Sequence, residues 1–372
     1  MGAVADDTVL VAGGGIAGLA LARALRQRDV PVELAERTPG GAGGLAINLP
    51  GNAVTALGTL GVGDGLARIG RPTGRREYRA RNGRLLFEVD EDAFWGAGAR
   101  PRCVLRSELH ALLADGLDVV PRAATVESVR TVTGGTEVTF GDGDVRRYGF
   151  VAGADGVRSA VRSSVFGSSG VREAVLSSAS WRFMAPNPGV DCWVAWSGAG
   201  GSFMLIPVGD ERVYGYASAT RGGPAGADPS WLAGTFATFP EPVRAVVGHL
   251  RDRPESLYHS PIEEVRVPSW ASGRVVLIGD AAHATAPVWA QGGALAAEDA
   301  LVLAELLAEG EWDTVGARYE RRRRARVEQV GAATDRFSKA LSVPTWLRDR
   351  LAPVIGPRSY RDAYDPLRRP MS

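Results

Sequence analysis

Lysine is almost absent from this chain of 372 residues, and histidine and cysteine are scarce. Lys339 is the only lysine, so a phosphate-loop lysine, a Schiff-base lysine or a halogenase lysine would have to be that residue. The two cysteines, Cys103 and Cys192, lie far apart without metal or redox spacing, and the 4 histidines stand singly. We therefore expect no bound metal. Two unpaired cysteines are typical of a reduced cytoplasmic setting.

Excess charge and long apolar runs are also missing. The chain carries 43 Lys and Arg against 42 Asp and Glu, and its net charge of +1 gives no electrostatic reason to bind nucleic acid or an anionic membrane. The apolar segment 8–25 follows Asp6 and Asp7 rather than basic residues and is rich in glycine, unlike a signal peptide. No stretch of about 20 uninterrupted apolar residues follows it. The sequence thus predicts a soluble, cytoplasmic protein.

The chain does have 45% apolar residues, enough for a large buried core, and a length that suggests two domains at about 150 residues each. Its beginning reads as strand, turn, helix and strand. The continuous apolar run 8–12 predicts a strand buried on both faces, and apolar residues at helical spacing follow it. Val32 to Ala35 is a second apolar strand, which ends at Glu36. We predict a compact β-α-β unit.

The turn between the first strand and the helix is rich in glycine. Gly13, Gly15 and Gly18 fit the spacing G-x-G-x-x-G. The first permits a tight turn, the second lets a pyrophosphate approach the backbone, and the third allows close packing of helix on strand. Free N–H groups at the helix start bind the anion, and Glu36 can accept hydrogen bonds from ribose hydroxyls. The pattern predicts a dinucleotide with a free 2′-hydroxyl, FAD or NAD rather than NADP.

A different pattern occupies the middle of the chain. Residues 77–89 and 178–219 carry aromatic side chains in short runs broken by Gly, Pro and Asp, which is typical of antiparallel strands and hairpins. A helix is expected over 292–307, followed by an arginine-rich helix through Ala340. We predict an α/β fold in which a Rossmann-like domain is interrupted by a β-sheet-rich domain and followed by a C-terminal helical segment. The first domain is expected at 1–75, 98–172 and 272–340, the second at 76–97 and 173–271, and a C-terminal tail at 341–372.

Two further segments decide between FAD and NAD. They are GADGVRSAVR, from Gly153 to Arg162, and GRVVLIGDAAHATAPVWAQGGALAAEDA, from Gly273 to Ala300. Together with the glycine turn and Arg106, they resemble, in the same order, the motifs of the class A FAD-dependent aromatic-ring hydroxylases, which are single-component flavoprotein monooxygenases. The resemblance spans nearly the whole chain. It implies FAD as the cofactor and a substrate domain in the β-rich insertion.

The last of these segments also has a physical interpretation. Asp280 follows a predicted buried strand, where its carboxylate can accept hydrogen bonds from a ribityl chain, and Pro287 fixes the backbone beside the flavin ring. The helix that begins at 291–294 points free N–H groups at the flavin and stabilises negative charge on the reduced ring. An Asp-capped turn before an ordinary helix is the structural alternative. Ala290 stands where many members of the family carry glycine.

The cofactor residues named by the motifs and the resemblance are Gly13, Gly15, Ile16, Ala17, Gly18, Glu36, Arg37, Ile47, Arg106, Val126, Asp155, Asp280, Pro287, Gln291, Gly292, Gly293 and Ala294. Arg37, Arg106 and Arg158 are candidates to pair with flavin or nicotinamide phosphates. The alternative for each of these arginines is a surface or structural ion pair.

The resemblance also implies the reaction. NADPH or NADH reduces FAD, O2 adds to form a flavin C4a-hydroperoxide, and its distal oxygen hydroxylates an aromatic or polyketide-like small molecule. Epoxidation, oxidative decarboxylation and dehydrogenation are alternatives with the same cofactor, and a non-catalytic flavin-binding protein is the alternative outside the enzymes. Because no second glycine fingerprint is present, NAD(P)H is expected to bind transiently. We expect a monomer or homodimer, and the arginine bias suggests a role in secondary metabolism.

The substrate is expected on a β-sheet floor beside the flavin, where apolar and aromatic walls suit an aromatic molecule. The candidate pocket residues are Trp181, Arg182, Trp193, Met204, Tyr214, Tyr216 and Trp289. For the aromatic residues the alternative is the protein core, and for Arg182 it is a solvated strand position rather than a partner for an anionic substrate. His283 is either a base or a residue that holds the cofactor turn, and no other catalytic residue is assigned. The run Arg321–Arg324 is expected to be a solvated helix face, with a partner or an NADPH phosphate as alternative ligands.

Overall fold

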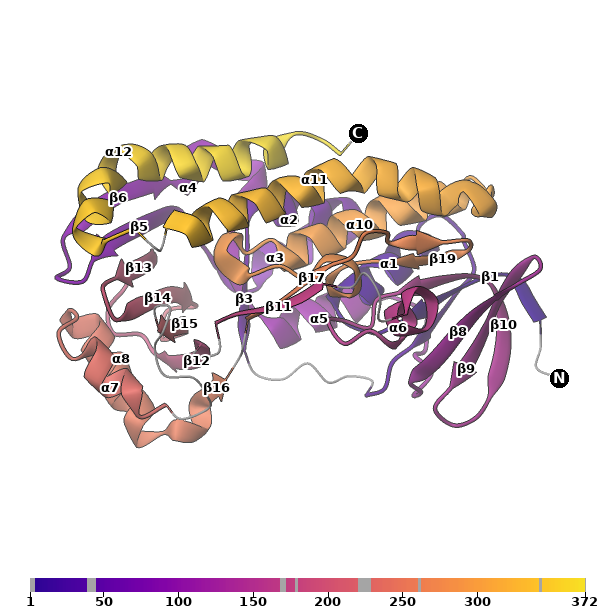
Figure 1. Ribbon diagram of the computed structural model, residues 1–372, viewed down its shortest axis with the longest axis horizontal. Coiled ribbons are helices and arrows are strands. Elements are labelled where there is room, and N and C mark those ends of the chain that lie inside the picture. The colour runs from indigo at the N-terminus through magenta and orange to yellow at the C-terminus, as the bar shows by residue number, and fades with distance from the viewer. Residues whose placement is uncertain are drawn as a thin grey trace.

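The computed structural model describes residues 4–38, 45–167, 172–177, 180–219, 229–259, 262–340 and 343–371. Two large β-sheets lie at opposite ends of the molecule, and long C-terminal helices cross between them (Figure 1). Ser178, with which the second predicted β-rich run begins, lies outside the described residues. The α/β fold and the C-terminal helical segment are confirmed. The exact domain bounds stay a prediction.

The first sheet contains the strands of the predicted Rossmann-like domain. Its order is β18-β19-β10-β1-β2, and β9 and β8 continue from β10. The strands β2, β1, β10 and β19 are parallel. Val9, Leu10 and Val11 in β1 have no exposed surface, because both faces of the sheet are covered. The bounds are β1 (Val4–Ala12), β2 (Val32–Ala35), β8 (Val126–Val132), β9 (Gly135–Phe140), β10 (Val145–Gly153), β18 (Ala271–Ser272) and β19 (Val275–Leu277).

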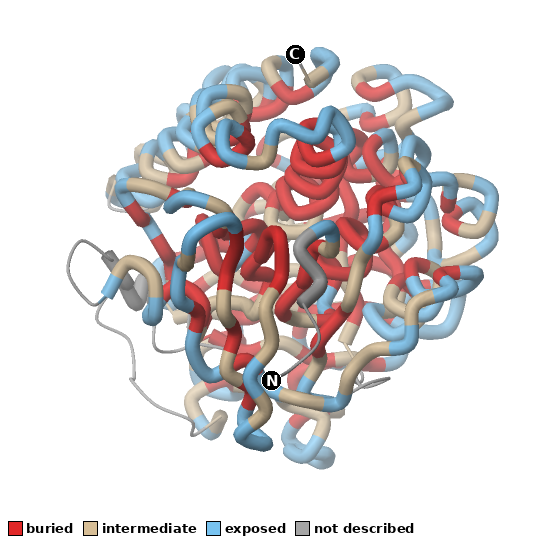
Figure 2. Tube along the Cα trace, turned by 90° about the vertical axis from the view of Figure 1, so that its right-hand side faces the viewer, coloured by how far each residue is buried: buried red, intermediate tan, exposed pale blue. Residues whose placement is uncertain are grey.

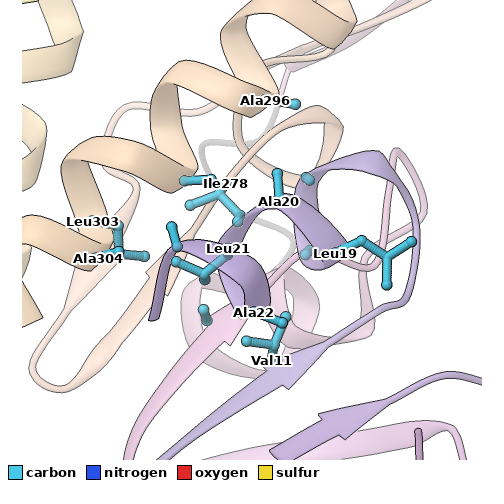
Figure 3. Close-up of a cluster of buried hydrophobic side chains, with 14 of the residues drawn as sticks. Val11, Leu19, Ala20, Leu21, Ala22, Ile278, Ala296, Leu303 and Ala304 are labelled. Carbon is cyan, nitrogen blue, oxygen red and sulfur yellow. The ribbon is translucent and has the colours of Figure 1, made fainter. Parts of the chain in front are cut away.

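Helix α1 (Ile16–Arg26) packs between this sheet and α10 (Gly292–Ala308). Figure 3 shows Leu19, Ala20, Leu21 and Ala22 of α1 among Val11, Ile278, Ala296, Leu303 and Ala304. Small alanine side chains on both helices let their backbones approach closely. The start of α1 and the start of α10 are thereby brought to the same edge of the sheet as the ends of β1 and β19.

Short elements complete the first domain around this core. The three-stranded antiparallel sheet β3-β7-β4 is built from β3 (Ala46–Leu49), β7 (Arg102–Leu105) and β4 (Arg71–Pro72). The helical elements are α2 (Gly51–Leu57), the π-helix η1 (Gly58–Val62), α3 (Gly63–Arg68), α5 (Arg106–Ala114), α6 (Ala160–Phe166), α9 (Asp280–His283) and the 3-10 turn η4 (Pro287–Trp289).

The second large sheet has the order β16-β12-β15-β14-β13-β5-β6, antiparallel except for β13 beside β5. Phe183 and Phe203 on one face pack with Phe236 and Phe239 under the helices α7 and α8. The other face is turned toward β3, β7 and α12. The strands are β5 (Arg75–Ala80), β6 (Leu85–Asp90), β12 (Ser180–Pro186), β13 (Trp193–Ser197), β14 (Gly201–Val208), β15 (Arg212–Ala219) and β16 (Leu257–His259). The remaining elements are α4 (Glu91–Trp95), η2 (Ala97–Ala99), α7 (Trp231–Phe236), α8 (Glu241–Asp252), η3 (Pro254–Ser256) and the ribbon β11 (Arg172–Ser177) with β17 (Ile262–Arg266).

The C-terminal helices are α11 (Trp312–Ala340) and α12 (Thr345–Tyr364), followed by η5 (Asp365–Arg368). Helix α12, in the stretch that the sequence analysis assigns to a tail, packs on β6 and α11. Tyr360 and Tyr364 of this helix are buried. Figure 2 shows buried residues running through the middle of the molecule, with exposed residues on the outer loops and helix faces. Helix α12 is thus part of the folded body.

Candidate cofactor and substrate site

The glycine turn at the end of β1 has the geometry of an anion cradle. Gly13 has φ +112°, and its N–H donates to the Ala35 carbonyl at 2.7 Å. A Cβ on Gly13 would overlap the Ala154 carbonyl, and one on Gly18 would overlap the Gly13 carbonyl. A Cβ on Gly15 would instead meet no protein atom within 4 Å. The turn therefore leaves open space at Gly15, at the start of α1, where phosphates can approach the backbone.

Glu36 lies against this turn at the end of β2. Its Oε2 accepts the N–H of Gly14 at 2.7 Å, and its Oε1 accepts the N–H of Thr38 at 2.9 Å. On the other side, His110 of α5 places Nε2 2.9 Å from the Gly14 carbonyl oxygen. Sequence reasoning does not find His110, although it follows Arg106 by one helical turn and shares its helix face. Glu36 and His110 together fix the orientation of the Gly14 peptide.

The carboxylate of Asp155 forms hydrogen bonds within the protein. Its carboxylate accepts the hydroxyl of Ser159, and Oδ2 also accepts the N–H of Val161 at 3.1 Å. Burial raises the pKa of Asp155, although these hydrogen bonds oppose the rise. The side chain therefore holds the turn between β10 and α6. Arg158 is exposed and lies 3.8 Å from Glu263, which is the surface ion pair that the sequence analysis gives as the alternative.

The other candidates near the glycine turn differ in the groups that a cofactor could contact. Ile16 and Ala17 form the first turn of α1, where N–H groups have no intrahelical acceptor. Arg37 and Arg106 are exposed, and neither guanidinium has a hydrogen bond or ion pair within the described part of the chain. Val126 begins β8 and is buried in the first core.

A second group of candidates meets at the start of α10. Asp280 is exposed within a segment, 275–284, whose other residues are buried. A Cβ on Gly292 would lie 3.8 Å from Asp280 Oδ1, and one on Gly293 would lie 3.2 Å from Ile47 Cδ1. The carboxylate of Asp280 is thus accessible beside the positive end of the α10 dipole. Ile47 covers the same helix end from β3.

Three buried polar atoms on the segments that flank this helix start lack a partner in the described protein. They are Asn48 Oδ1, Thr285 Oγ1 and Trp289 Nε1. Asn48 follows Ile47 on β3, while Thr285 and Trp289 flank Pro287, which is exposed. Buried polar groups normally have partners, so these atoms fit a site that a ligand with donors and acceptors completes. A flavin has both. Asn48 and Thr285 are absent from the sequence prediction, because their burial arises only in the fold.

His283 is tied to α10. Its Nε2 lies 2.7 Å from Asp299 Oδ2, which also accepts the N–H of Gly279 at 2.9 Å. Asp299 Oδ1 accepts Arg323 Nε at 2.8 Å. Burial would raise the pKa of Asp299, but the charges of His283 and Arg323 lower it to about 2. Through these contacts His283 connects the turn after β19 to α10, and its action as a base stays a prediction.

The prediction of a solvated face for Arg321–Arg324 is wrong for Arg323. This side chain is 1% exposed and pairs with Glu298 as well as Asp299. Its helix neighbours do reach the surface, where Arg322 pairs with Glu305. Because α11 packs on α10, one of four consecutive arginines necessarily faces inward, and two buried carboxylates on α10 receive it.

Gln291 contributes to the same buried network. Its Oε1 accepts Asn52 Nδ2 at 3.0 Å, and Asn52 Nδ2 also reaches Glu298 Oε1 at 3.0 Å. Gln291 itself is 1% exposed. Its side chain is therefore used in hydrogen bonds within the protein, so only its backbone is available to a cofactor. Ala294, one turn further, is fully buried, so it too can offer only backbone.

The candidate substrate wall lies on the inner face of the second sheet. Residues opposite each other on neighbouring strands share a face. Tyr216 lies opposite Met204 and Arg182, and Tyr214 lies opposite Met184. Met204, Tyr214 and Trp193 belong to one cluster with Ala46 of β3 and Cys103 of β7. Four strands of this sheet thus present their side chains toward the strand that carries Ile47.

Two predicted pocket residues lie elsewhere. Trp181 alternates with Arg182 on β12 and lies opposite Ala217, which packs under α7 and α8, so Trp181 is on the outer face. Trp289 packs at the other side of the site, with its ring 5.7 Å from that of Tyr364. The alternation of a strand explains the first correction, since consecutive residues point to opposite faces. Trp289 borders the cofactor loop rather than the sheet floor.

Arg182 has an unusual environment for an arginine. Its Nε atom is buried and has no hydrogen-bond partner, and no carboxylate pairs with it among the described residues. Burial raises the pKa of Tyr214, opposed by the charge of Arg182. Burial also raises the pKa of Tyr216, opposed by hydrogen bonds with Ser218 and Ser180 and, to a smaller extent, by the charge of Arg182. Both tyrosines are therefore neutral at pH near 7. An uncompensated guanidinium beside two phenols is suited to hold an anionic or strongly accepting oxygen.

The comparisons with known proteins agree with this geometry. A family model described as an FAD binding domain matches residues 6–334. A 2-heptyl-3-hydroxy-4(1H)-quinolone synthase of Pseudomonas aeruginosa is 33% identical over 375 residues, covering 95% of this chain and 96% of the relative. The chain belongs to the class A FAD-dependent aromatic hydroxylases. The predictions of FAD as cofactor and of an FAD-dependent monooxygenase are confirmed.

Other members of the family support the same assignment for this hydroxylase. Aurachin C monooxygenase/isomerase of Stigmatella aurantiaca is 32% identical and covers 92% of this chain and 93% of the relative. Among solved structures, HpxO of Klebsiella pneumoniae in complex with FAD and uric acid has a TM-score of 0.77 at 26% identity. The match covers 97% of this chain and 92% of HpxO.

Two features are absent from the described residues. No helix in that part of the chain has the length and apolar content to cross a bilayer. No group of three or more His, Cys, Asp or Glu side chains there is placed to hold a metal ion.

Replacing Asp280 tests the second group of cofactor candidates. In Asp280→Ala, loss of a charged hydrogen-bond acceptor beside the α10 start is expected to raise the dissociation constant for FAD by roughly 10- to 100-fold. Fluorescence titration of the apoprotein with FAD measures it. Asp210→Ala is the control, since that side chain is 97% exposed and pairs with Arg71 at the surface. Equal affinities in all three proteins would remove Asp280 from the site.

Proposed function

We propose that this hydroxylase acts on an electron-rich aromatic molecule of the quinolone class, with Arg182 holding a ring oxygen and Met204, Tyr214 and Tyr216 forming the floor. The unpaired, partly buried guanidinium on an otherwise apolar and aromatic sheet face carries this proposal. The similarity to a quinolone synthase and to an aurachin C monooxygenase supports it. A 4-quinolone offers an oxygen that is negative after deprotonation and a flat ring that suits aromatic walls.

Bound FAD, reduced by NAD(P)H, supplies the activation of O2 that no side chain provides. The chain contributes binding and electrostatics. The Gly15 cradle and the start of α1 would hold the pyrophosphate, Glu36 the ribose, and Asp280 the ribityl chain. The N–H groups of Gly292 and Gly293, at the positive end of the α10 dipole, would stabilise negative charge on the ring. The apolar sheet face excludes water from the reacting side.

Charge on the substrate oxygen makes the ring more nucleophilic. Arg182 stabilises the deprotonated form of a hydroxy or oxo group by a charge-assisted hydrogen bond. Tyr214, which remains protonated, can donate to the same oxygen. The side chains of the floor thus orient the ring with its electron-rich carbon toward the flavin and leave the chemistry to the cofactor.

A substrate panel tests the function. The purified holoenzyme is assayed for NADH and NADPH oxidation with a 2-alkyl-4-quinolone, a hydroxybenzoate and a polyketide-like phenol, and the products are analysed by mass under isotopically labelled O2. We expect the quinolone to stimulate oxidation most and to gain one labelled oxygen. Stimulation without oxygen gain would indicate dehydrogenation, and release of CO2 would indicate oxidative decarboxylation. Equal basal rates with all three compounds would contradict the proposed substrate class.

Arg182 is the residue whose replacement best separates binding from chemistry. Arg182→Met is expected to raise KM for the quinolone by roughly 10- to 100-fold, because a charged hydrogen bond in a partly buried site is lost. Arg212→Met, at the exposed end of β15 on the same sheet, is the matched control and should keep the wild-type KM. An unchanged KM in Arg182→Met would show that the substrate does not contact this side chain.

Other features of the function remain proposals of the same kind. The expected partners are the small-molecule substrate, O2 and a transiently bound NADPH or NADH. A monomer or homodimer in the cytoplasm is the predicted form, and a role in secondary metabolism fits a quinolone-like substrate. Size-exclusion chromatography with light scattering measures the oligomeric state.

A further inference from the structure

Tyr364, the last residue of helix α12, contacts the loop beside the flavin candidates. It has no exposed surface, and its hydroxyl donates to the Trp289 carbonyl oxygen at 2.7 Å. Its ring also packs edge-on against the Trp289 indole, with an interplanar angle of 90°. Helix α12 thus reaches the segment that connects Pro287 with the start of α10.

That segment contains a strained residue. Ala290 has φ +54° and ψ 33°, a left-handed conformation that costs free energy for any residue with a Cβ. Such a conformation persists only where its surroundings impose it. The Ala290 N–H donates to the Pro287 carbonyl at 3.2 Å, and Gln291 Nε2 lies 3.4 Å from the Trp289 carbonyl oxygen. The Tyr364 hydroxyl makes the shortest of the hydrogen bonds to the Trp289 carbonyl.

Helix α12 is itself fixed to the second sheet by a buried ion pair. Arg76 of β5 and Glu91 of α4 pair with 2% and 0% of their side chains exposed. The Tyr360 hydroxyl donates to Glu91 Oε2 at 2.9 Å, and Trp95 Nε1 donates to the Tyr360 hydroxyl at 3.1 Å. The charge pair therefore holds α12 one turn before Tyr364.

The same ion pair touches the substrate floor. The Arg76 guanidinium lies 5.1 Å from the centre of the Trp193 ring and 5.7 Å from the rings of Tyr360 and Tyr364. A continuous set of contacts thus runs from Trp193 on the sheet through Arg76 and α12 to the Trp289 carbonyl. Its two ends lie on the substrate side and the cofactor side of the site.

We propose that Tyr364 is a positioning residue, which fixes the left-handed bend at Ala290 and so sets the start of α10 against the flavin ring. Arg76 and Glu91 stabilise the packing of α12 on the sheet, while Tyr364 makes the contact with the cofactor loop. This inference rests on the proposed place of the flavin beside Pro287 and Gly292, but not on the identity of the substrate.

The test is Tyr364→Phe, which removes one hydroxyl and keeps the ring. We expect normal FAD content, a shifted visible spectrum of the bound flavin, and a several-fold larger share of NAD(P)H oxidation that ends as hydrogen peroxide instead of product. Tyr360→Phe is the matched control on the same helix. It loses the contact to Glu91, so its melting temperature should fall while its flavin spectrum and coupling stay as in the wild type.

Two outcomes would overturn the proposal. One is a wild-type spectrum and coupling in Tyr364→Phe, and the other is an equal change in both variants, which would show a general loss of α12 packing. Ala290→Gly in the Tyr364→Phe background gives a further check, because glycine adopts the bend without strain. We expect it to restore the spectrum, and no restoration would count against the bend. The spectrum needs no substrate, so a wrong substrate class leaves this test intact.

Discussion

Gly15→Val is expected to give a folded protein that retains no FAD. The Cβ position of Gly15 faces open space with no protein atom within 4 Å, so the valine side chain does not disturb the fold. It occupies the space that the pyrophosphate needs at the start of α1, and loss of those phosphate contacts removes the main anchor of the cofactor. Absorbance of the purified protein and FAD released on denaturation measure the effect. Circular dichroism reports the fold.

Gly18→Ala is the contrasting variant for this experiment. It adds a smaller group, yet its Cβ would overlap the Gly13 carbonyl, where α1 crosses β1. We expect it to lower the melting temperature or abolish folding, unlike Gly15→Val. If Gly15→Val retains normal FAD, the pyrophosphate does not lie at this turn. If both variants are equally unfolded, the distinction between cradle and packing glycine is wrong.

Arg323→Met is expected to destabilise the protein by about 3 kcal/mol, because it leaves Glu298 and Asp299 as buried carboxylates without their shared cation. Arg326 and His283 compensate in part. Urea unfolding of the holoenzyme measures the loss. Arg322→Met is the control on the neighbouring position, where a half-exposed ion pair contributes less than about 1 kcal/mol. Similar losses in the two variants would contradict the assigned role of Arg323.

The same network predicts a dependence of stability on acid. Folding lowers the pKa of Asp299 from 3.8 to about 2, so the stabilisation is complete above pH of about 4 and is lost as the pH falls toward 2. The shift corresponds to about 2 kcal/mol. Asp299→Asn should be less stable at neutral pH and should have a shallower acid slope. An unchanged slope would show that Asp299 does not titrate with folding.

Motifs with a backbone function could be predicted from the sequence. The roles of Gly13, Gly15 and Gly18 follow from their spacing between a strand and a helix. The lack of a Cβ atom acts on the local backbone, so it does not depend on distant parts of the chain. The α10 start at Gly292 and the accessible Asp280 are local features of the same type. The β-rich insertion could be predicted because short aromatic runs that are broken by glycine and proline usually form antiparallel strands joined by hairpin turns.

Side chains whose role depends on a partner far along the chain were beyond such reasoning. In the sequence, Arg323 is one of four consecutive arginines that suggest a solvated helix face. Only the structure shows that it is buried against two carboxylates of α10. Trp181 and Arg182 are neighbours in sequence but lie on opposite faces of β12, and the register of β15 decides which of them faces the site. Asn48 and Thr285 become candidate cofactor ligands only because the fold buries their oxygen atoms away from water, and the sequence does not show that burial.

The sequence by itself determined the class of fold, the cofactor and the glycine turn, because these depend on local backbone geometry and short motifs. Only the tertiary structure decided which polar groups are buried, which face of the sheet forms the floor, and that the C-terminal helix reaches the cofactor loop. Such outcomes depend on contacts between residues hundreds of positions apart, as between Trp95 and Tyr360. The sequence pattern of one segment does not show which distant segment will pack against it.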